Sequence, residues 1–198
     1  MERFPDKKNE RYLSAEELSV LGSALTDAEA SGQNPIAINA IRLLIFTGCR
    51  KSEVLKLRWD EVDFQQGYLN FPDSKTGQKR VPLGSSALEV LVSIKRIDGN
   101  PFVFPGEKDG SHFIGLPRIW RRIRSDAGLS DVRLHDLRHS FASVGVGAGI
   151  GLPVVGRLLG HRDSTTTARY AHVADDPAKE AAEKITRSLS LQLSKRSI

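Results

Sequence analysis

The sequence predicts an α+β fold that is mostly helical, with a small three-stranded antiparallel sheet at one edge. Apolar residues recur every three or four positions along most of the 198 residues, which is the period of an amphipathic helix. Between residues 62 and 83 the pattern changes to alternation, and turn signals at Gln66-Gly67 and Thr76-Gly77 separate three short strands. Three strands are too few to form the main core, so the helices must supply it.

The first helix is predicted from a capping box, in which Ser14 precedes Glu17 by three positions. Gly32 is expected to end it. A second helix is expected over residues 35–47, where apolar side chains form one buried stripe, and Gly48 should end that helix. A short helix over residues 53–57 follows.

The remaining elements follow from the same two periods. The strands are expected over residues 62–64, 68–71 and 79–83. Further helices are expected over residues 85–97, 114–127, 134–146, 153–159 and 165–173. A last helix should begin at Asp176-Pro177, with an apolar stripe that includes Ile185 and Leu189. Residues 1–13 are interpreted as a linker or tail.

Composition narrows the class of protein. The formal net charge of +5, with six arginines between residues 118 and 138, suits an anionic partner, although such a basic face is usually only solvated. Cys49 is the only cysteine, which excludes an internal disulfide. The first residues are polar, and no apolar run could cross a bilayer, so we expect a cytoplasmic protein that binds no membrane.

Two arginines stand where they could bind a phosphate group. Arg50 follows a predicted helix end, and Arg138 lies three positions after His135, on the same face of a predicted helix. An arginine fork donates two hydrogen bonds to phosphate and stays charged, while a histidine beside it can shuttle a proton. Glu53 could orient a basic group or simply be an acid in the first turn of a helix. Taken singly, each is more simply explained as solvated helix surface.

A lysine and a histidine extend this set. Lys75 lies at the tip of the second hairpin, where it could donate a proton to a leaving oxygen, with Lys79 as its nearest competitor. Lysines on hairpin tips usually only lie in water. His161 follows Gly160 at a predicted helix end and could donate a hydrogen bond to a phosphate oxygen.

Tyr170 lies nine residues after His161. A phenol is a poor nucleophile, because it loses its proton only near pH ~10. It becomes credible only among cations that also bind the group under attack, such as a phosphate diester. A lone tyrosine on a helix is more often part of a core. His161 and His172 could instead be metal ligands, but no carboxylate or cysteine at helical spacing supports that alternative, so no metal or cofactor is expected.

The order of these residues along the chain is more informative than any one of them. Together they resemble the tyrosine recombinase, or phage integrase, family. The matching stretches are Thr47-Gly-Cys-Arg-Lys-Ser-Glu53, Ser74-Lys-Thr-Gly77, Leu134-His-Asp-Leu-Arg-His-Ser-Phe141, Leu158-Leu-Gly-His161 and Thr167-Ala-Arg-Tyr170.

The resemblance implies that Tyr170 attacks the scissile phosphate of double-stranded DNA, which forms a 3′-phosphotyrosyl link and frees a 5′-hydroxyl. The covalent link conserves the phosphodiester energy, so resealing would need no ATP, and the arginines would take the place of a metal cation. The other implied roles are Arg50 and Arg138 as phosphate clamps, Lys75 as general acid, His135 as proton-transfer aid, His161 as phosphate donor and Glu53 as an orienting group.

The resemblance also implies a domain organisation. Family members clamp DNA between two domains, and residues 14–198 resemble the catalytic one. The N-terminal core-binding domain has no room before Ser14, so it is expected to be absent. A homo-oligomer, a tetramer on DNA, is implied, although the isolated domain could be a monomer. The last helix would dock on a neighbouring subunit or fold back on its own.

The expected activity is strand cleavage and rejoining that integrates or excises a mobile element. Two alternatives stay open. The same chemistry could relax supercoils, as a type IB topoisomerase does by resealing the original ends. The chain could also be a DNA-binding fragment without site-specific recombination of its own.

Overall fold

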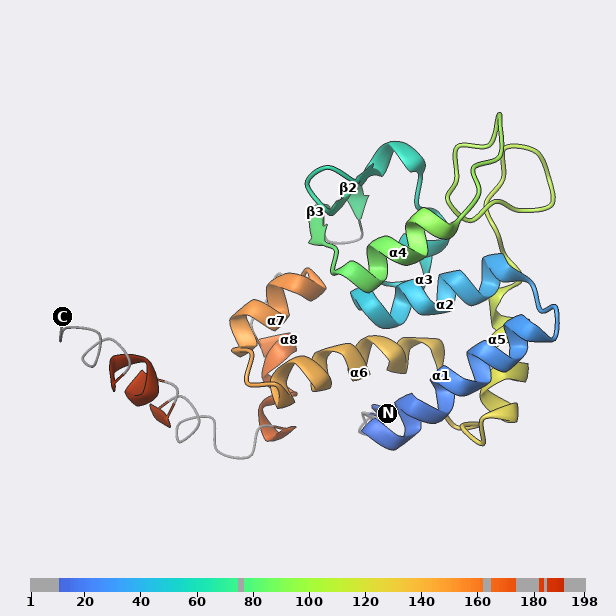
Figure 1. Ribbon diagram of the computed structural model, residues 1–198. Coiled ribbons are helices and arrows are strands. Elements are labelled where there is room, and N and C mark those ends of the chain that lie inside the picture. Colours follow the sequence, from blue (N-terminus) through green and yellow to red (C-terminus); the bar gives the residue numbers. More distant parts are fainter. Residues whose placement is uncertain (1–10, 75–76, 162–164, 174–181, 184, 191–198) are drawn as a thin grey trace, which may run out of the picture.

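The computed structural model describes residues 11–74, 77–161, 165–173, 182–183 and 185–190. Most of these residues are helical, and the sheet lies at one end of the molecule (Figure 1). The helices are α1 (Ala15–Ala30), α2 (Pro35–Thr47), α3 (Lys51–Leu55), α4 (Ser85–Ser93), α5 (Leu116–Asp126), α6 (Leu134–Gly147), α7 (Leu152–Leu159) and α8 (Thr165–Ala168). Two 3-10 helices, η1 (Trp59–Glu61) and η2 (Ala171–Val173), connect them. The predicted α+β fold is thereby confirmed.

The sheet is an antiparallel meander of β1 (Val62–Asp63), β2 (Tyr68–Ser74) and β3 (Gly77–Pro82), in the order β1-β2-β3. Leu69 pairs with Val81, and both side chains are buried against the helices. Lys79 pairs with Phe71, so its side chain also lies on the buried face. The alternation of a strand therefore turns one cation of β3 toward the interior.

The main core surrounds α2. This helix is buried on almost every side, and it packs against α4 on one side and against α6 on the other. A helix that is apolar all round belongs in the middle of a domain, which explains why its sequence carries so few polar residues. The same core includes apolar side chains of α1, α3, α5 and the sheet.

A second, smaller apolar cluster joins the last described helices to α6. It consists of Ala142, Val146, Val155, Leu159 and Tyr170, with Phe141, Leu152 and Val173 packed against it. These side chains come from α6, α7 and the segment after α8. Figure 1 shows α7 and α8 grouped at the end of α6, beside the sheet.

Several boundaries differ from the sequence prediction. The helix expected over residues 53–57 is α3, Lys51–Leu55, because the Glu53 carboxylate caps the Arg50 backbone N–H and starts the helix earlier. The helix expected to reach residue 97 ends at Ser93, whose hydroxyl donates to the Val90 carbonyl. Beyond it, the Arg96 guanidinium lies 4.5 Å from the centre of the Trp59 ring, which holds this segment against η1.

The helix expected over residues 165–173 is divided in two. It is α8 followed by η2, and Tyr170 lies in the turn between them rather than on a helix. The Tyr170 backbone N–H donates to the Thr167 carbonyl at 3.0 Å, a three-residue bond that tightens the chain there. The turn aims the phenol into the small apolar cluster.

The two ends of the chain were predicted with different success. The capping box at the start of α1 is confirmed, since Ser14 and Glu17 bond to each other's backbone N–H groups. The predicted cap of the last helix, Asp176-Pro177, lies outside the described residues. Residues 182–183 and 185–190 are helical, and Ile185 and Leu189 are exposed. No described helix is long and apolar enough to cross a membrane.

Candidate active site

Arg138 is buried on α6 and binds the ends of two other helices. One terminal nitrogen donates to the Gly48 carbonyl at 2.7 Å, and the other donates to the Leu159 carbonyl at 2.8 Å. Both acceptors are at helix C-termini, where carbonyls lack partners within the helix and carry the negative end of the helix dipole. Two backbone segments thus hold the guanidinium in one orientation.

Gly48 is the C-cap of α2 and is the reason this arrangement is possible. Its φ is 60°, in the left-handed region, and a Cβ there would lie 2.7 Å from the Cδ1 atom of Phe141. Glycine is therefore required both for the turn and for the close approach of α6. The glycine that the sequence placed at a helix end also presents its carbonyl to Arg138.

Arg50 follows Gly48 after one residue and is joined to Lys79 through Glu53. One Glu53 carboxylate oxygen accepts from the Arg50 guanidinium at 2.8 Å, and the other accepts from the Lys79 Nζ at 2.9 Å. Burial alone would raise the pKa of Glu53, but the charge of Lys79 and the bonds from Lys79 and Arg50 hold it below its ordinary value. Glu53 is thus an ionised bridge between α3 and β3.

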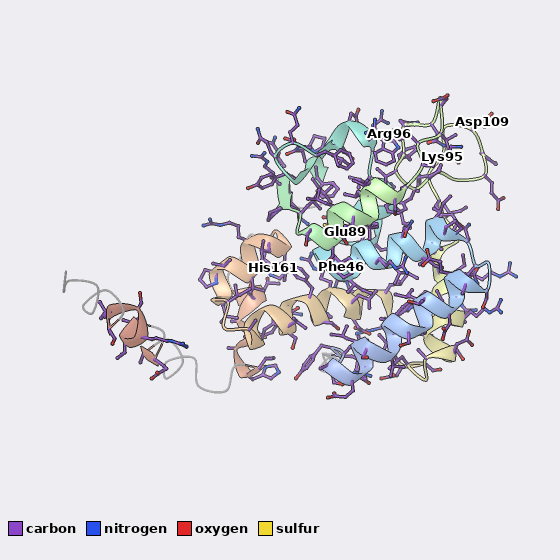
Figure 2. The ribbon with its side chains drawn as sticks, in the orientation of Figure 1. Phe46, Glu89, Lys95, Arg96, Asp109 and His161 are labelled. Atoms are coloured by element: carbon purple, nitrogen blue, oxygen red, sulfur yellow. The ribbon has the colours of Figure 1, made fainter. Side chains whose placement is uncertain are left out.

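His161 follows α7 (Figure 2). The charges of Arg138, Arg50 and Lys79 all act on its ring. Its Nδ1 is 2.9 Å from the Thr167 hydroxyl of α8. Burial, and then the charge of Arg138, lowers the pKa of His161 to about 4, so its ring is neutral at neutral pH. Gly160 brings His161 close to the hairpin, since a Cβ there would lie 2.8 Å from the Cδ atom of Lys79.

Tyr170 is 4% exposed, and its hydroxyl oxygen lies 2.6 Å from Nδ1 of His139. His139 follows Arg138 directly on α6 and is also buried. His135, one turn earlier, meets the His139 ring edge to face, with ring centres 4.9 Å apart. Burial, and then the charge of Arg138, lowers the pKa of His135. The phenol, two imidazoles and a guanidinium therefore share one region.

The structure brings together most of the residues singled out in the sequence. Arg50, Arg138, His135 and His161 lie within electrostatic range of one another. Tyr170 lies within the same range, since its ionised form would raise the pKa of Arg138. Lys75 lies outside the described residues, between the end of β2 and the start of β3. Among the described residues, no cluster of three or more His, Cys, Asp or Glu side chains could hold a metal ion.

Two members of this site were not assigned to it from the sequence. The sequence pattern does not single out His139, yet its ring contacts the Tyr170 hydroxyl. The available signal was its spacing, four positions after His135, which places both on neighbouring turns. Lys79 was only a competitor of Lys75, and its burial follows from the register of β3.

Comparison with known proteins identifies the family. Residues 11–176 match the profile of the phage integrase family. The sequence is 30% identical over 179 residues to a tyrosine recombinase of Thermosipho africanus, an alignment that covers 88% of this chain and 61% of that protein. The chain belongs to the phage integrase family, and it spans less than two thirds of the length of this relative.

Two solved structures have the same fold. The crystal structure of XerA recombinase superposes with a TM-score of 0.70 and 24% identity, covering 92% of this chain and 66% of that one. The pre-cleavage complex of XerH site-specific recombinase bound to its difH substrate has a TM-score of 0.67 and 24% identity, covering 88% of this chain and 52% of that one. Tyrosine recombinase structures thus share this arrangement of helices and sheet.

Proposed function

We propose that this chain is the catalytic domain of a site-specific recombinase that cleaves and rejoins DNA strands through Tyr170. The observation that carries the proposal is the gathering of a buried phenol, two arginines and three histidines in one site, in a chain of the phage integrase family. Residues 14–198 would form this domain. The reaction would integrate or excise a mobile element.

In this mechanism Arg50 and Arg138 bind the nonbridging oxygens of the scissile phosphate. The Tyr170 oxygen attacks phosphorus, the bond to the 5′-oxygen breaks, and a 3′-phosphotyrosyl link remains. Two nitrogens of Arg138 already donate hydrogen bonds to backbone carbonyls. The orientation of the guanidinium is therefore fixed before the charge of the five-coordinate transition state develops. His161 donates a hydrogen bond to the phosphate, and His135 assists proton transfer at the tyrosine. Because the arginines supply positive charge, the scheme requires no metal, and because the phosphotyrosyl link keeps the energy of the phosphodiester, it requires no ATP.

Lys75 is proposed as the general acid that protonates the departing 5′-oxygen. Support comes from the other lysine of this hairpin, Lys79, which is 8% exposed and has its Nζ on the Glu53 carboxylate. A lysine whose ammonium group holds a buried ion pair is the less suitable proton donor, since loss of its proton would leave Glu53 with only Arg50 as a counter-ion. Glu53 in turn orients Arg50.

The basic side of α5 is the proposed path of the DNA backbone away from the site. This helix buries Leu116, Trp120 and Ile123 and turns its arginines outward. A hollow of about 450 Å³ next to Arg50 is lined by basic side chains that include Lys51, Arg121, Arg124, Arg133 and His135. Cations in such a hollow can neutralise successive phosphates, which gives sequence-independent affinity.

A homo-oligomer, a tetramer on DNA, is proposed for the active assembly. Support comes from an apolar groove of about 360 Å³ formed by α2, α6 and α7, in which Phe46 of α2 takes part (Figure 2). Phe46 and Val144 are exposed in this groove. The exposed side chains Ile185 and Leu189 form an apolar stripe suited to such a groove, in cis or on a neighbouring subunit.

A DNA duplex with a nick close to the cleavage site tests the proposed reaction. The short 5′-hydroxyl fragment diffuses away after attack and prevents resealing, so wild-type protein should accumulate as a covalent adduct on a denaturing gel. Tyr170→Phe should form none. Tyr68→Phe, at a tyrosine of β2, is the matched control and should behave as wild type. Equal adduct from wild-type protein and Tyr170→Phe would overturn the assignment of the nucleophile.

A further inference from the structure

The contact between Tyr170 and His139 has no role in the mechanism above. The Tyr170 hydroxyl oxygen and His139 Nδ1 are 2.6 Å apart, a short distance even for a hydrogen bond from a hydroxyl. Tyr170 is 4% exposed and His139 is 8% exposed, so water has little access to either side chain. A buried phenol left without a partner would cost free energy, which favours retention of this bond.

The elements around this contact define where the phenolic oxygen lies. The ring of Tyr170 belongs to one buried apolar cluster with Ala142, Val155 and Leu159. His139 is held by α6 and by the edge-to-face contact with His135. His139 is also the residue after Arg138, the proposed phosphate clamp. Two consecutive residues of α6 therefore serve the two reactants. His139 contacts the attacking oxygen, and Arg138 binds the phosphate under attack.

The charge state of His139 decides what its Nδ1 can do. Burial, and then the neighbouring His135, lowers the pKa of His139 to about 4, and the nearby Arg169 and Arg133 act in the same direction. Asp136 opposes this effect. At neutral pH the ring is neutral, and the tautomer with its proton on Nε2 leaves a lone pair on Nδ1. Since a free phenol titrates near pH ~10, the shared proton stays on the tyrosine oxygen.

We propose that His139 is a positioning residue for the nucleophile, whose Nδ1 accepts a hydrogen bond from the Tyr170 hydroxyl and sets the side-chain rotamer from which the phenol attacks. This inference rests on the proposed function only in naming Tyr170 as the nucleophile; the hydrogen bond itself belongs to the resting protein. His139 holds the oxygen, and His135 remains the proton-transfer aid.

Single-turnover adduct formation on the nicked duplex tests this role. His139→Ala should slow the step by about tenfold to a hundredfold, because an attacking atom displaced by about 1 Å loses that much rate, while DNA affinity stays within about twofold. His139→Asn should recover most of the rate, since its carbonyl oxygen can take the place of Nδ1. His139→Gln should not, because its longer side chain carries the oxygen toward the Nε2 position.

His112→Ala, at a histidine of the loop before α5, controls for the loss of a histidine and should match wild type. The comparison of His139→Asn with His139→Gln keeps the test decisive if His139→Ala does not fold. Wild-type rate in His139→Ala, or equal rates in the Asn and Gln variants, would overturn the proposal.

A second measurement does not depend on activity. In protein with ¹⁵N-labelled histidine, the Nδ1 resonance of His139 should be that of an unprotonated acceptor, and Tyr170→Phe should shift it downfield because the hydrogen bond is lost. No shift would contradict the inference. If wild-type protein forms no adduct but this resonance moves as expected, the proposed function fails while the contact and its positioning geometry stand.

Discussion

Arg138 and Tyr170 are both buried, but they are held in different ways. Arg138 is tied to the backbone of two helix ends, next to an ion-pair network that joins α3 to β3. Tyr170 lies in a turn between two short helices, packed in the small apolar cluster and bonded through its hydroxyl to His139. Within the described residues, the cationic side is thus built into the framework of the domain, and the nucleophile joins it from a separate segment.

This difference indicates a division of tasks. Donors that must stabilise a developing negative charge act best when they are fixed beforehand, because no reorganisation is needed during the reaction. The two backbone carbonyls fix Arg138 in this way. A nucleophile forms a new bond and must be released from it again, so a turn between two short helical segments, outside α6, suits Tyr170. Changes on the cationic side should therefore affect both folding and catalysis.

The largest effect is expected from Arg138→Ala. Loss of a preorganised donor to the transition state should slow DNA cleavage about 10²- to 10³-fold. The carbonyls of Gly48 and Leu159 would also lose their buried donor, which should destabilise the fold by about 1–3 kcal/mol for each carbonyl. Single-turnover cleavage and chemical denaturation measure the two losses.

Two variants sharpen this comparison. Arg138→Lys keeps the charge but lacks the fork that reaches both carbonyls, so it should recover only a small part of either loss. Arg122→Ala, at an exposed arginine of α5, should leave stability unchanged within about 0.5 kcal/mol. If Arg138→Ala were as stable as wild type, the guanidinium would not be part of the framework.

A smaller effect on stability is expected from Glu53→Gln. The variant should lose about 3–5 kcal/mol at neutral pH, because Lys79 would keep a buried charge without its counter-ion. Glu29→Gln, which breaks an exposed pair with Arg42, should lose no more than about 1 kcal/mol. Urea titrations of both variants give the comparison.

The stability that ionised Glu53 contributes should depend on pH in a definite direction. The pKa of Glu53 is lowered in the folded protein, so its contribution is complete above the unfolded-state pKa of about 4.3. The contribution disappears as the pH falls through the lower folded-state pKa. The difference between wild type and Glu53→Gln should therefore shrink in acid, and a difference independent of pH would contradict an ionised Glu53.

The smallest effect is expected from His161→Gln. The pKa of His161 is about 4 in the folded protein and about 6.5 in an unfolded chain, so the unfolded state binds the proton first. Stability from neutral His161 is complete above pH ~6.5 and is lost as the pH falls toward the folded value. The variant should lose less stability than wild type between pH 7 and 5 in thermal melts, with His112→Gln as control. An unchanged slope would contradict a partly buried, neutral His161.

The helices of this fold were predictable because their signals are local. Ser14 and Glu17 cap α1 as their spacing indicates, and Gly48 ends α2. One helix end that was wrong depends on a distant contact. Arg96 lies beyond the end of α4 and stacks on Trp59, which is far away in the sequence. No local pattern therefore predicts that α4 ends at Ser93.

The site was predictable where residues share an element and less so where elements meet. His135 and Arg138 were expected on one helix face, and both lie there. The contact of His139 with Tyr170 joins α6 to the turn after α8, 31 positions further along the chain. The Lys79–Glu53 pair depends on the register of β3 and on the packing of β3 against α3. Such contacts follow from tertiary packing, which periodicity does not encode.

The most direct test of this account identifies the atom that carries the DNA. Wild-type protein is trapped on the nicked duplex, digested with a protease and a nuclease, and the modified peptide is sequenced by mass spectrometry. The account predicts a 3′-nucleotide on the peptide that contains Tyr170, linked through the phenolic oxygen. A nucleotide on Tyr12, Tyr68 or any residue other than Tyr170 would contradict it.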